Sequence, residues 1–169
     1  LIPNFQALAH HYNNSRWNDS TVESGNWVVI VFVSTDCSHC WNTGDDLSYW
    51  SMTYANDTLF LALAVNFSSN DNFNATPEEV VAFQEKANYS GCYYGTKNCN
   101  ERPGEPHEFP YIDDRNQSVM YQWDVSGTPA FFIIQPNGTV IWNQYQHRSD
   151  NGGDGESIEV ALERLFGES

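Results

Sequence analysis

Runs of apolar residues along the chain predict several buried strands. Residues 27–34 (WVVIVFVS) and 59–67 (LFLALAVNF) are continuous aliphatic and aromatic runs, the pattern of strands buried on both faces of a parallel sheet. Residues 129–135 (PAFFIIQ) have the same character. The Pro-Asn-Gly sequence at 136–138 predicts a hairpin turn, because Asn and Gly tolerate positive φ. Residues 139–145 should therefore run back antiparallel.

Helical patterns separate these strands. Residues 37–54 have apolar side chains at roughly helical spacing, although Gly44 weakens the middle. Residues 76–89 begin with Thr-Pro-Glu-Glu, a helix start with Thr as N-cap and acidic residues near the positive end of the dipole. Residues 157–166 form a last amphipathic helix, whereas residues 118–123 indicate a weak extended segment. This order predicts an α/β fold with a mixed central sheet flanked by helices.

Length and charge narrow the class of protein. The 169 residues fit one domain, 1–169, with an inserted loop at about 91–109. The 22 acidic and 7 basic residues give a net charge of −15, which excludes nucleic acid and anionic membranes as partners. The longest apolar runs have seven residues, whereas a membrane helix needs about 20. We expect no membrane insertion by this segment, and any signal peptide or anchor to lie outside it.

Asparagine triplets favour an extracytoplasmic location. Asn-x-Ser/Thr acceptor triplets are more frequent than the about 2.6 that the composition gives by chance. They begin at Asn13, Asn18, Asn56, Asn66, Asn74, Asn88, Asn116 and Asn137. The alternative is an Asn-rich surface with accidental triplets, because a sequence does not show modification.

The first cysteine pair has the spacing of a redox site. Cys37-Ser38-His39-Cys40 follows a predicted strand and opens a predicted helix, where the helix dipole and free N–H groups stabilise a thiolate. Zinc sites also use Cys-x-x-Cys, but the second pair, Cys92 and Cys99, has a spacing that suits a zinc ribbon poorly. We therefore interpret Cys37 and Cys40 as a redox-active disulfide, with no metal and no other cofactor.

Two motifs together resemble the thioredoxin fold. The run WVVIVFVS before Cys37-Ser38-His39-Cys40, and Val-Ser-Gly-Thr-Pro-Ala-Phe-Phe-Ile-Ile at 125–134 followed by Asn-Gly-Thr-Val, look like an extracytoplasmic TlpA/ResA-like protein over residues 26–166. The resemblance implies that the Thr128–Pro129 peptide is cis, lies against the active-site pair and binds substrate. It also implies that His39 makes the disulfide more oxidising, and that Trp41 is exposed to partners.

The sequence departs from that family at two places. Asp36 stands where thioredoxins usually have Trp, and we expect its carboxylate to point into water. Val31 occupies the position of a buried Asp, so the base that deprotonates Cys40 must come from elsewhere. The other histidines have polar neighbours and are interpreted as isolated surface residues; they are His10, His11, His107 and His147.

The second cysteine pair is interpreted as a structural staple. A Cys92–Cys99 disulfide would close an eight-residue segment and stabilise the fold by about 2.5 kcal/mol. A second redox pair, or a resolving partner for Cys37, is the alternative. A structural disulfide would also indicate an oxidising compartment.

These observations favour a monomeric, extracytoplasmic thiol-disulfide oxidoreductase. Cys37 would attack, Cys40 would resolve, and the partners would be protein thiols or disulfides together with an unidentified redox partner. The sequence leaves open whether it acts as oxidant, reductant or isomerase. One alternative is a module that binds copper or zinc through Cys37, His39 and Cys40, and another is a non-catalytic interaction domain with a permanent disulfide.

Overall fold

A mixed six-stranded sheet organises the computed structural model, which describes residues 2–3, 26–68, 73–137 and 139–167. The strand order across the sheet is β1-β4-β3-β2-β5-β6. The strands are β1 (Ile2–Pro3), β2 (Trp27–Val33), β3 (Thr58–Ala64), β4 (Tyr111–Asp113), β5 (Ala130–Ile134) and β6 (Val140–Asn143). β2 is central, parallel to β3 and antiparallel to β5. The predicted α/β class with a mixed sheet is confirmed.

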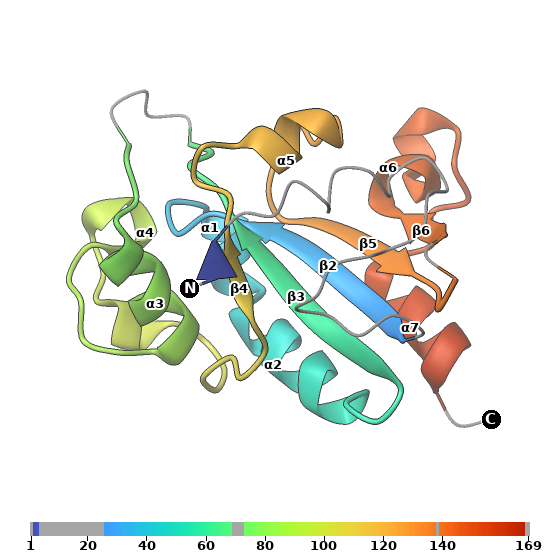
Figure 1. The fold of residues 1–169 in the computed structure, drawn as a ribbon, viewed down its shortest axis with the longest axis horizontal. Coiled ribbons are helices and arrows are strands. Elements are labelled where there is room, and N and C mark those ends of the chain that lie inside the picture. The colour runs from blue at the N-terminus through green and yellow to red at the C-terminus, as the bar shows by residue number, and fades with distance from the viewer. Residues whose placement is uncertain (1, 4–25, 69–72, 138, 168–169) are drawn as a thin grey trace.

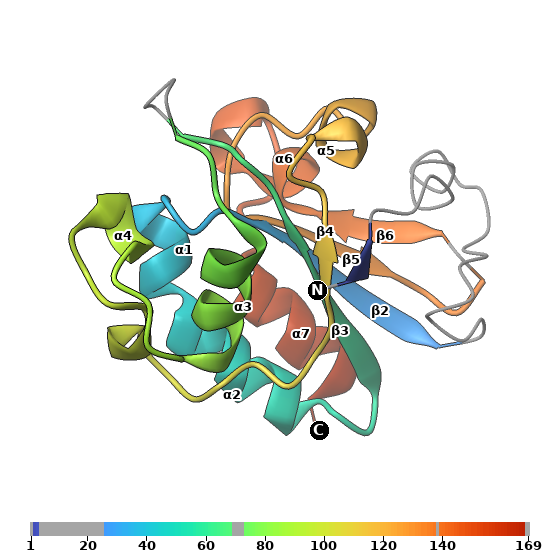
Figure 2. The same cartoon turned by 60° about the vertical axis from the view of Figure 1, so that its left-hand side comes forward.

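Helices cover both faces of this sheet (Figure 1). They are α1 (Ser38–Asn42), α2 (Gly44–Thr53), α3 (Pro77–Glu85), α4 (Cys92–Gly95), α5 (Ser118–Gln122), α6 (Gln144–His147) and α7 (Ile158–Phe166), with 3-10 turns η2 (Cys99–Glu101) and η3 (Ser149–Asn151). Figure 2 shows α2, α3 and α7 on one face, with α5 on the other.

Alternate side chains of β2 belong to two hydrophobic cores, one on each face of the sheet. Val29, Val31 and Val33 pack with the side chains of α1, α2, α3 and α7. Their neighbours Val28 and Ile30 point to the other face and pack with α5. Because both faces are covered, β2 is apolar along its whole length, as the uninterrupted run predicts.

The second half of the chain departs from the sequence predictions. Residues 118–122 form helix α5, so the predicted extended segment is wrong: the Asp114 carboxylate accepts hydrogen bonds from the N–H groups of Val119 (3.0 Å) and Met120 (2.9 Å) and so caps a helix. β4 was not predicted, because three residues are too few for a periodic signal.

The helix predicted at 37–54 is divided into α1 and α2 at Thr43. The helices predicted after residues 76 and 157 are confirmed, and Thr76 and Ser157 are their N-caps. No helix in the described part of the chain is long and apolar enough to cross a bilayer.

Candidate active site

Cys37 lies at the junction between β2 and α1. It is the N-cap of α1, and its Sγ accepts a hydrogen bond from the N–H of Cys40 at 3.1 Å. The side chain is half-buried and the thiol is free. The structure thus places the first thiol at the start of the helix, where the spacing predicted it.

Cys40 lies one turn further along α1 and has no exposed surface. Its Sγ accepts a hydrogen bond from the N–H of Ser34 at 3.5 Å, and its thiol is also free. Only Cys37 of this pair is therefore open to a partner.

The two thiols have opposite acidities. A hydrogen bond from the Cys40 thiol is the largest cause that lowers the Cys37 pKa to about 6; burial opposes it, and the Thr128 side chain and the N–H groups of Cys40 and His39 add to the lowering. Burial is the largest cause that raises the pKa of Cys40 well above its ordinary value, and Cys37 raises it further. The lowered pKa favours the thiolate of Cys37 at neutral pH, while the raised pKa favours the protonated thiol of Cys40.

Thr128 and Pro129 lie against this pair. The peptide bond between them is cis, and the Cys37 thiol donates to the carbonyl oxygen of Thr128 at 3.4 Å. Thr128 Oγ1 is buried and has no hydrogen-bond partner among the described residues. When Cys37 loses its proton, this hydroxyl can donate to the thiolate, which accounts for its effect on the Cys37 pKa.

His39 is exposed and lies beside the same segment. Its imidazole lines an open groove together with Pro129 and Phe131 of the β5 side, and with the connection between β6 and α7. The causes of the Cys37 pKa shift include the N–H of His39 and not its ring. The proposed influence of the imidazole on the redox potential stays a prediction.

Trp41 is not exposed, so that prediction is wrong. Only 3% of its surface is accessible. The Tyr93 ring lies 5.4 Å from the Trp41 ring, and the Lys97 ammonium lies 5.9 Å above the Trp41 ring. The inserted loop covers Trp41 and removes it from the surface that a substrate could reach.

Asp36 is buried as well, contrary to the expectation that it points into water. Its carboxylate accepts a short hydrogen bond from the Ser68 hydroxyl, because the chain after β3 folds over the turn before Cys37. The neighbouring Thr35 hydroxyl donates to the buried Glu79 of α3 at 3.0 Å. Burial raises the pKa of Glu79, and the charge of Asp36 raises it further.

The inserted loop contains the expected Cys92–Cys99 disulfide, with a Cα–Cα distance of 5.2 Å. Neither cysteine has exposed surface, so the pair does not exchange with partners as folded. The N–H of Tyr93, next to Cys92, donates to the carbonyl oxygen of Thr35 at 3.2 Å. The staple therefore reaches the turn that presents Cys37.

Arg102 connects the same loop to the start of α2, the helix that follows α1. Its side chain is fully buried, and within the described part of the chain its N–H groups donate to five carbonyl oxygens. These belong to Phe83, Gly44, Pro103, Gln84 and Glu105. A Cβ at Gly44 would lie 2.8 Å from Arg102 Nη1, so glycine is needed for this close approach.

His107 is buried at the same place, so the prediction of a surface histidine is wrong. Its Nε2 is 2.8 Å from the carbonyl oxygen of Gly44, and its Nδ1 is 2.7 Å from the Tyr111 hydroxyl. Burial is the largest cause that lowers the His107 pKa to about 3, and Arg102 lowers it further. The sequence pattern around His107 does not predict its burial, because its partner Gly44 is 63 residues away along the chain. Of the other histidines predicted at the surface, His147 is half-buried and forms a hydrogen bond with Asp154. His10 and His11 lie outside the described residues.

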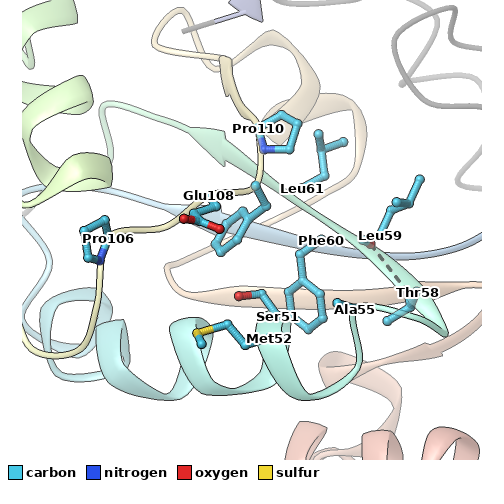
Figure 3. Close-up of a pocket in the computed structure, with 11 residues that line it drawn as sticks. Ser51, Met52, Ala55, Thr58, Leu59, Phe60, Leu61, Pro106, Glu108 and Pro110 are labelled. Atoms are coloured by element: carbon cyan, nitrogen blue, oxygen red, sulfur yellow. Dashed lines mark hydrogen bonds between the residues drawn. The ribbon is translucent and has the colours of Figure 1, made fainter.

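A separate pocket of about 390 Å³ lies between α2, β3 and the segment before β4 (Figure 3). Met52, Phe60, Phe109 and Pro110 give it a mostly apolar lining. Its lining includes neither His39 of the Cys37–Cys40 motif nor the cis residue Pro129, whereas the groove beside Pro129 includes both, so that groove is the better candidate for substrate.

Solved structures resemble this fold at low identity. A hypothetical protein from Sinorhizobium meliloti 1021 has a TM-score of 0.53 and 21% identity, covering 71% of this chain and 56% of that one. A Chlorobium tepidum protein with the provisional name thiol:disulfide interchange protein DsbE has a TM-score of 0.51 and 18% identity, covering 71% and 67%. A secreted Mycobacterium tuberculosis disulfide oxidoreductase homologous to E. coli DsbE has a TM-score of 0.49 and 18% identity, covering 69% and 67%.

Comparison at the level of sequence families is more decisive. No curated protein matches the chain. The model of the AhpC/TSA family matches residues 1–143. Because this match covers well over half of the chain, the protein belongs to the AhpC/TSA family and is a thioredoxin-like oxidoreductase.

Proposed function

We propose that the protein exchanges disulfides with extracytoplasmic protein substrates through Cys37 and Cys40. The observation that carries this proposal is the asymmetry of the two sulfurs. Cys37 is half-buried with a pKa of about 6, while Cys40 is fully buried with a raised pKa. An accessible thiolate beside a shielded thiol is the arrangement that two-step disulfide exchange needs.

The exchange runs in two displacements. The Cys37 thiolate attacks one sulfur of a substrate disulfide, which forms a mixed disulfide and releases the other substrate sulfur as a thiolate. Cys40 then loses its proton and attacks Cys37 Sγ, which forms the Cys37–Cys40 disulfide and releases the second substrate thiolate. The substrate gains two electrons and the protein loses two, and the reverse sequence oxidises a substrate dithiol.

Thr128 and Pro129 supply the binding surface. Pro129 has no N–H, so this edge near Cys37 has one backbone donor fewer. In this proposal the backbone of Thr128 pairs with an extended peptide by β-augmentation. His39 lines the same groove as Pro129, so we propose that its side chain lies beside the bound substrate.

The staple and the surface support an oxidising location. A fully buried disulfide in the inserted loop is typical of proteins outside the reducing cytosol. Five of the acceptor asparagines in the described residues are exposed, namely Asn56, Asn74, Asn88, Asn116 and Asn137. We further propose a monomer with no organic cofactor, whose net charge of −15 favours neutral or basic substrates.

No observation favours the metal-binding alternative. In the part of the chain that the structure describes, no three His, Cys, Asp or Glu residues are grouped so that they could hold a metal ion.

Replacing Cys40 by Ala tests the order of attack. The variant should accumulate mixed disulfides with an oxidised protein substrate through Cys37, because no second thiol releases them. The complexes are counted by non-reducing electrophoresis. The Cys37→Ala variant is the control and should trap none, and equal trapping by the two variants would contradict the mechanism.

The pH dependence of alkylation tests the acidity of Cys37. Because its pKa is lowered to about 6, the thiolate and the alkylation rate rise with pH through about 6 and level off near pH 7.5. Iodoacetamide uptake by the reduced protein is measured by mass spectrometry, with Cys37→Ala giving the background. A midpoint near 8.5, the value of a free thiol, would refute the proposed function.

A further inference from the structure

The antiparallel ladder between β5 and β6 ends before it reaches the active site. The last register pair toward the thiols is Phe132 with Asn143. After Asn143 the chain turns into α6, and the Asn143 side chain caps this helix by accepting from the N–H of Gln146 at 3.0 Å. The backbone of β6 therefore does not extend along residues 129–131.

Beyond the end of β6, the side chain of Gln144 makes the hydrogen bonds to residues 129–131 that a continued strand would make. Its Oε1 accepts from the N–H of Phe131 at 2.9 Å, and its Nε2 donates to the carbonyl oxygen of Pro129 at 3.2 Å. A primary amide offers an acceptor and a donor side by side, as a peptide unit does. An ionised carboxylate of the same size would keep the acceptor and lose the donor.

These two bonds hold the segment that contacts Cys37. They lie on either side of Ala130, directly after the cis peptide between Thr128 and Pro129. The carbonyl oxygen of Thr128 is 3.4 Å from Cys37 Sγ. Among the described residues, Gln144 forms no hydrogen bond with either thiol, and it lines the groove that contains Pro129.

We propose that Gln144 is a positioning residue that replaces a strand of the sheet and holds the Thr128–Pro129 segment at its working distance from Cys37. The proposal rests on the proposed function. Without the amide, Pro129 can move away from Cys37, which weakens both the peptide-binding edge and the contact between Thr128 and the thiolate.

Single-turnover exchange with two substrates separates this role from general stability. The probes are an extended peptide whose cysteine carries thionitrobenzoate, and free dithiobis-nitrobenzoate, which does not use the peptide edge. In Gln144→Leu the half-saturating concentration of the peptide should rise about tenfold, because two hydrogen bonds that fix its binding edge are lost. The half-saturating concentration of the small disulfide should stay unchanged, and the alkylation midpoint of Cys37 should move to higher pH.

Gln146→Leu is the matched control. Gln146 lies on the same helix, and its side chain accepts from Asn143 Nδ2 without touching β5. It should leave the kinetics of both probes and the Cys37 midpoint at their wild-type values.

Gln144→Glu adds an acid rescue. Above the pKa of the glutamate, the carboxylate faces the carbonyl oxygen of Pro129 without a proton, so peptide binding should be impaired. Below that pKa the carboxyl group can donate to Pro129 and accept from Phe131, so the ratio of variant to wild-type half-saturation should approach one. A residue that only stabilises α6 would not produce this pH dependence.

The outcomes distinguish the two proposals. If wild-type Cys37 reacts no faster than free cysteine near pH 7, the proposed function fails. If wild-type Cys37 is reactive but Gln144→Leu behaves as Gln146→Leu does with both probes, the role of Gln144 is refuted. If Gln144→Leu does not fold, Gln144→Glu decides: a ratio that is constant with pH overturns the proposal.

Discussion

Two regions flank the reactive cysteines and are built in different ways. On one side, the insertion (about residues 91–109) is fastened by a buried disulfide and by the buried Arg102. On the other side, the connection between β6 and α7 (residues 144–157) is polar, with a His147–Asp154 hydrogen bond and an exposed Arg148–Asp150 ion pair.

This difference indicates that one region supports the cysteines, while the other contacts the substrate. Because Arg102 and His107 of the insertion are buried, water competes little for their hydrogen bonds to Gly44, and Tyr93 of the insertion also donates to Thr35, so this contact is rigid. Surface ion pairs compete with water and contribute little, so the β6–α7 connection can adjust to a substrate. The fixed side keeps the thiols in place, and the adjustable side forms the wall of the groove.

The largest expected effect comes from removing the buried cation. Arg102→Met removes a buried hydrogen-bond donor from five carbonyl oxygens, and we expect the free energy of unfolding to fall by about 3–5 kcal/mol. Urea unfolding followed by circular dichroism measures it. Arg148→Met is the control on the other side, where the side chain is exposed, and should leave the unfolding midpoint unchanged. Equal losses in both variants would abolish the distinction between the two regions.

Removing the Cys92–Cys99 disulfide should lower the free energy of unfolding by less than Arg102→Met does. The double variant Cys92→Ala, Cys99→Ala loses the constraint that the disulfide places on the unfolded chain, about 2.5 kcal/mol for this loop length. The same unfolding experiment measures it, and reductant should then have no further effect on the variant. Because Tyr93 also loosens, Trp41 should become accessible to a fluorescence quencher. A variant as stable as the wild type, with Trp41 still shielded, would show that the disulfide does not maintain this region.

The smallest expected loss of stability tests the contact between the insertion and the start of α2. Gly44→Ala puts a Cβ 2.8 Å from Arg102 Nη1 and from the carbonyl oxygen of Pro103, so we expect a loss of about 2 kcal/mol in the free energy of unfolding. Gly127→Ala on the other side is the control: its Cβ meets no atom within 4 Å, so its change should stay within about 0.5 kcal/mol. If both variants lost the same free energy of unfolding, the insertion would accommodate an added Cβ as readily as the loop before Pro129 does.

The sequence predicts what is local. The strand before Cys37 is a seven-residue apolar run, and the adjacent Thr76 and Pro77 predict the start of α3. The Cys-x-x-Cys spacing itself places Cys37 at the cap of α1 and Cys40 within its first turn. Such features depend on residues a few positions apart, which a pattern along the chain records.

The sequence did not predict what depends on distant partners. Trp41 is buried by Tyr93, and His107 is buried because its partners are Tyr111 and the carbonyl oxygen of Gly44. Gln144 has no distinguishing pattern at all, since a glutamine beside Asn143 is typical of any polar turn. These positions acquire their roles only when the insertion and the β6–α7 connection fold onto the sheet.

The depth of Cys40 has a consequence for damage by oxidants. A diffusing peroxide reaches Cys37 but not Cys40, which has no exposed surface. The sulfenic acid that forms on Cys37 has a thiol of the same chain beside it, so condensation to the disulfide competes with further oxidation to the irreversible sulfinic acid. Burial of the resolving cysteine thus protects the redox pair from being permanently lost.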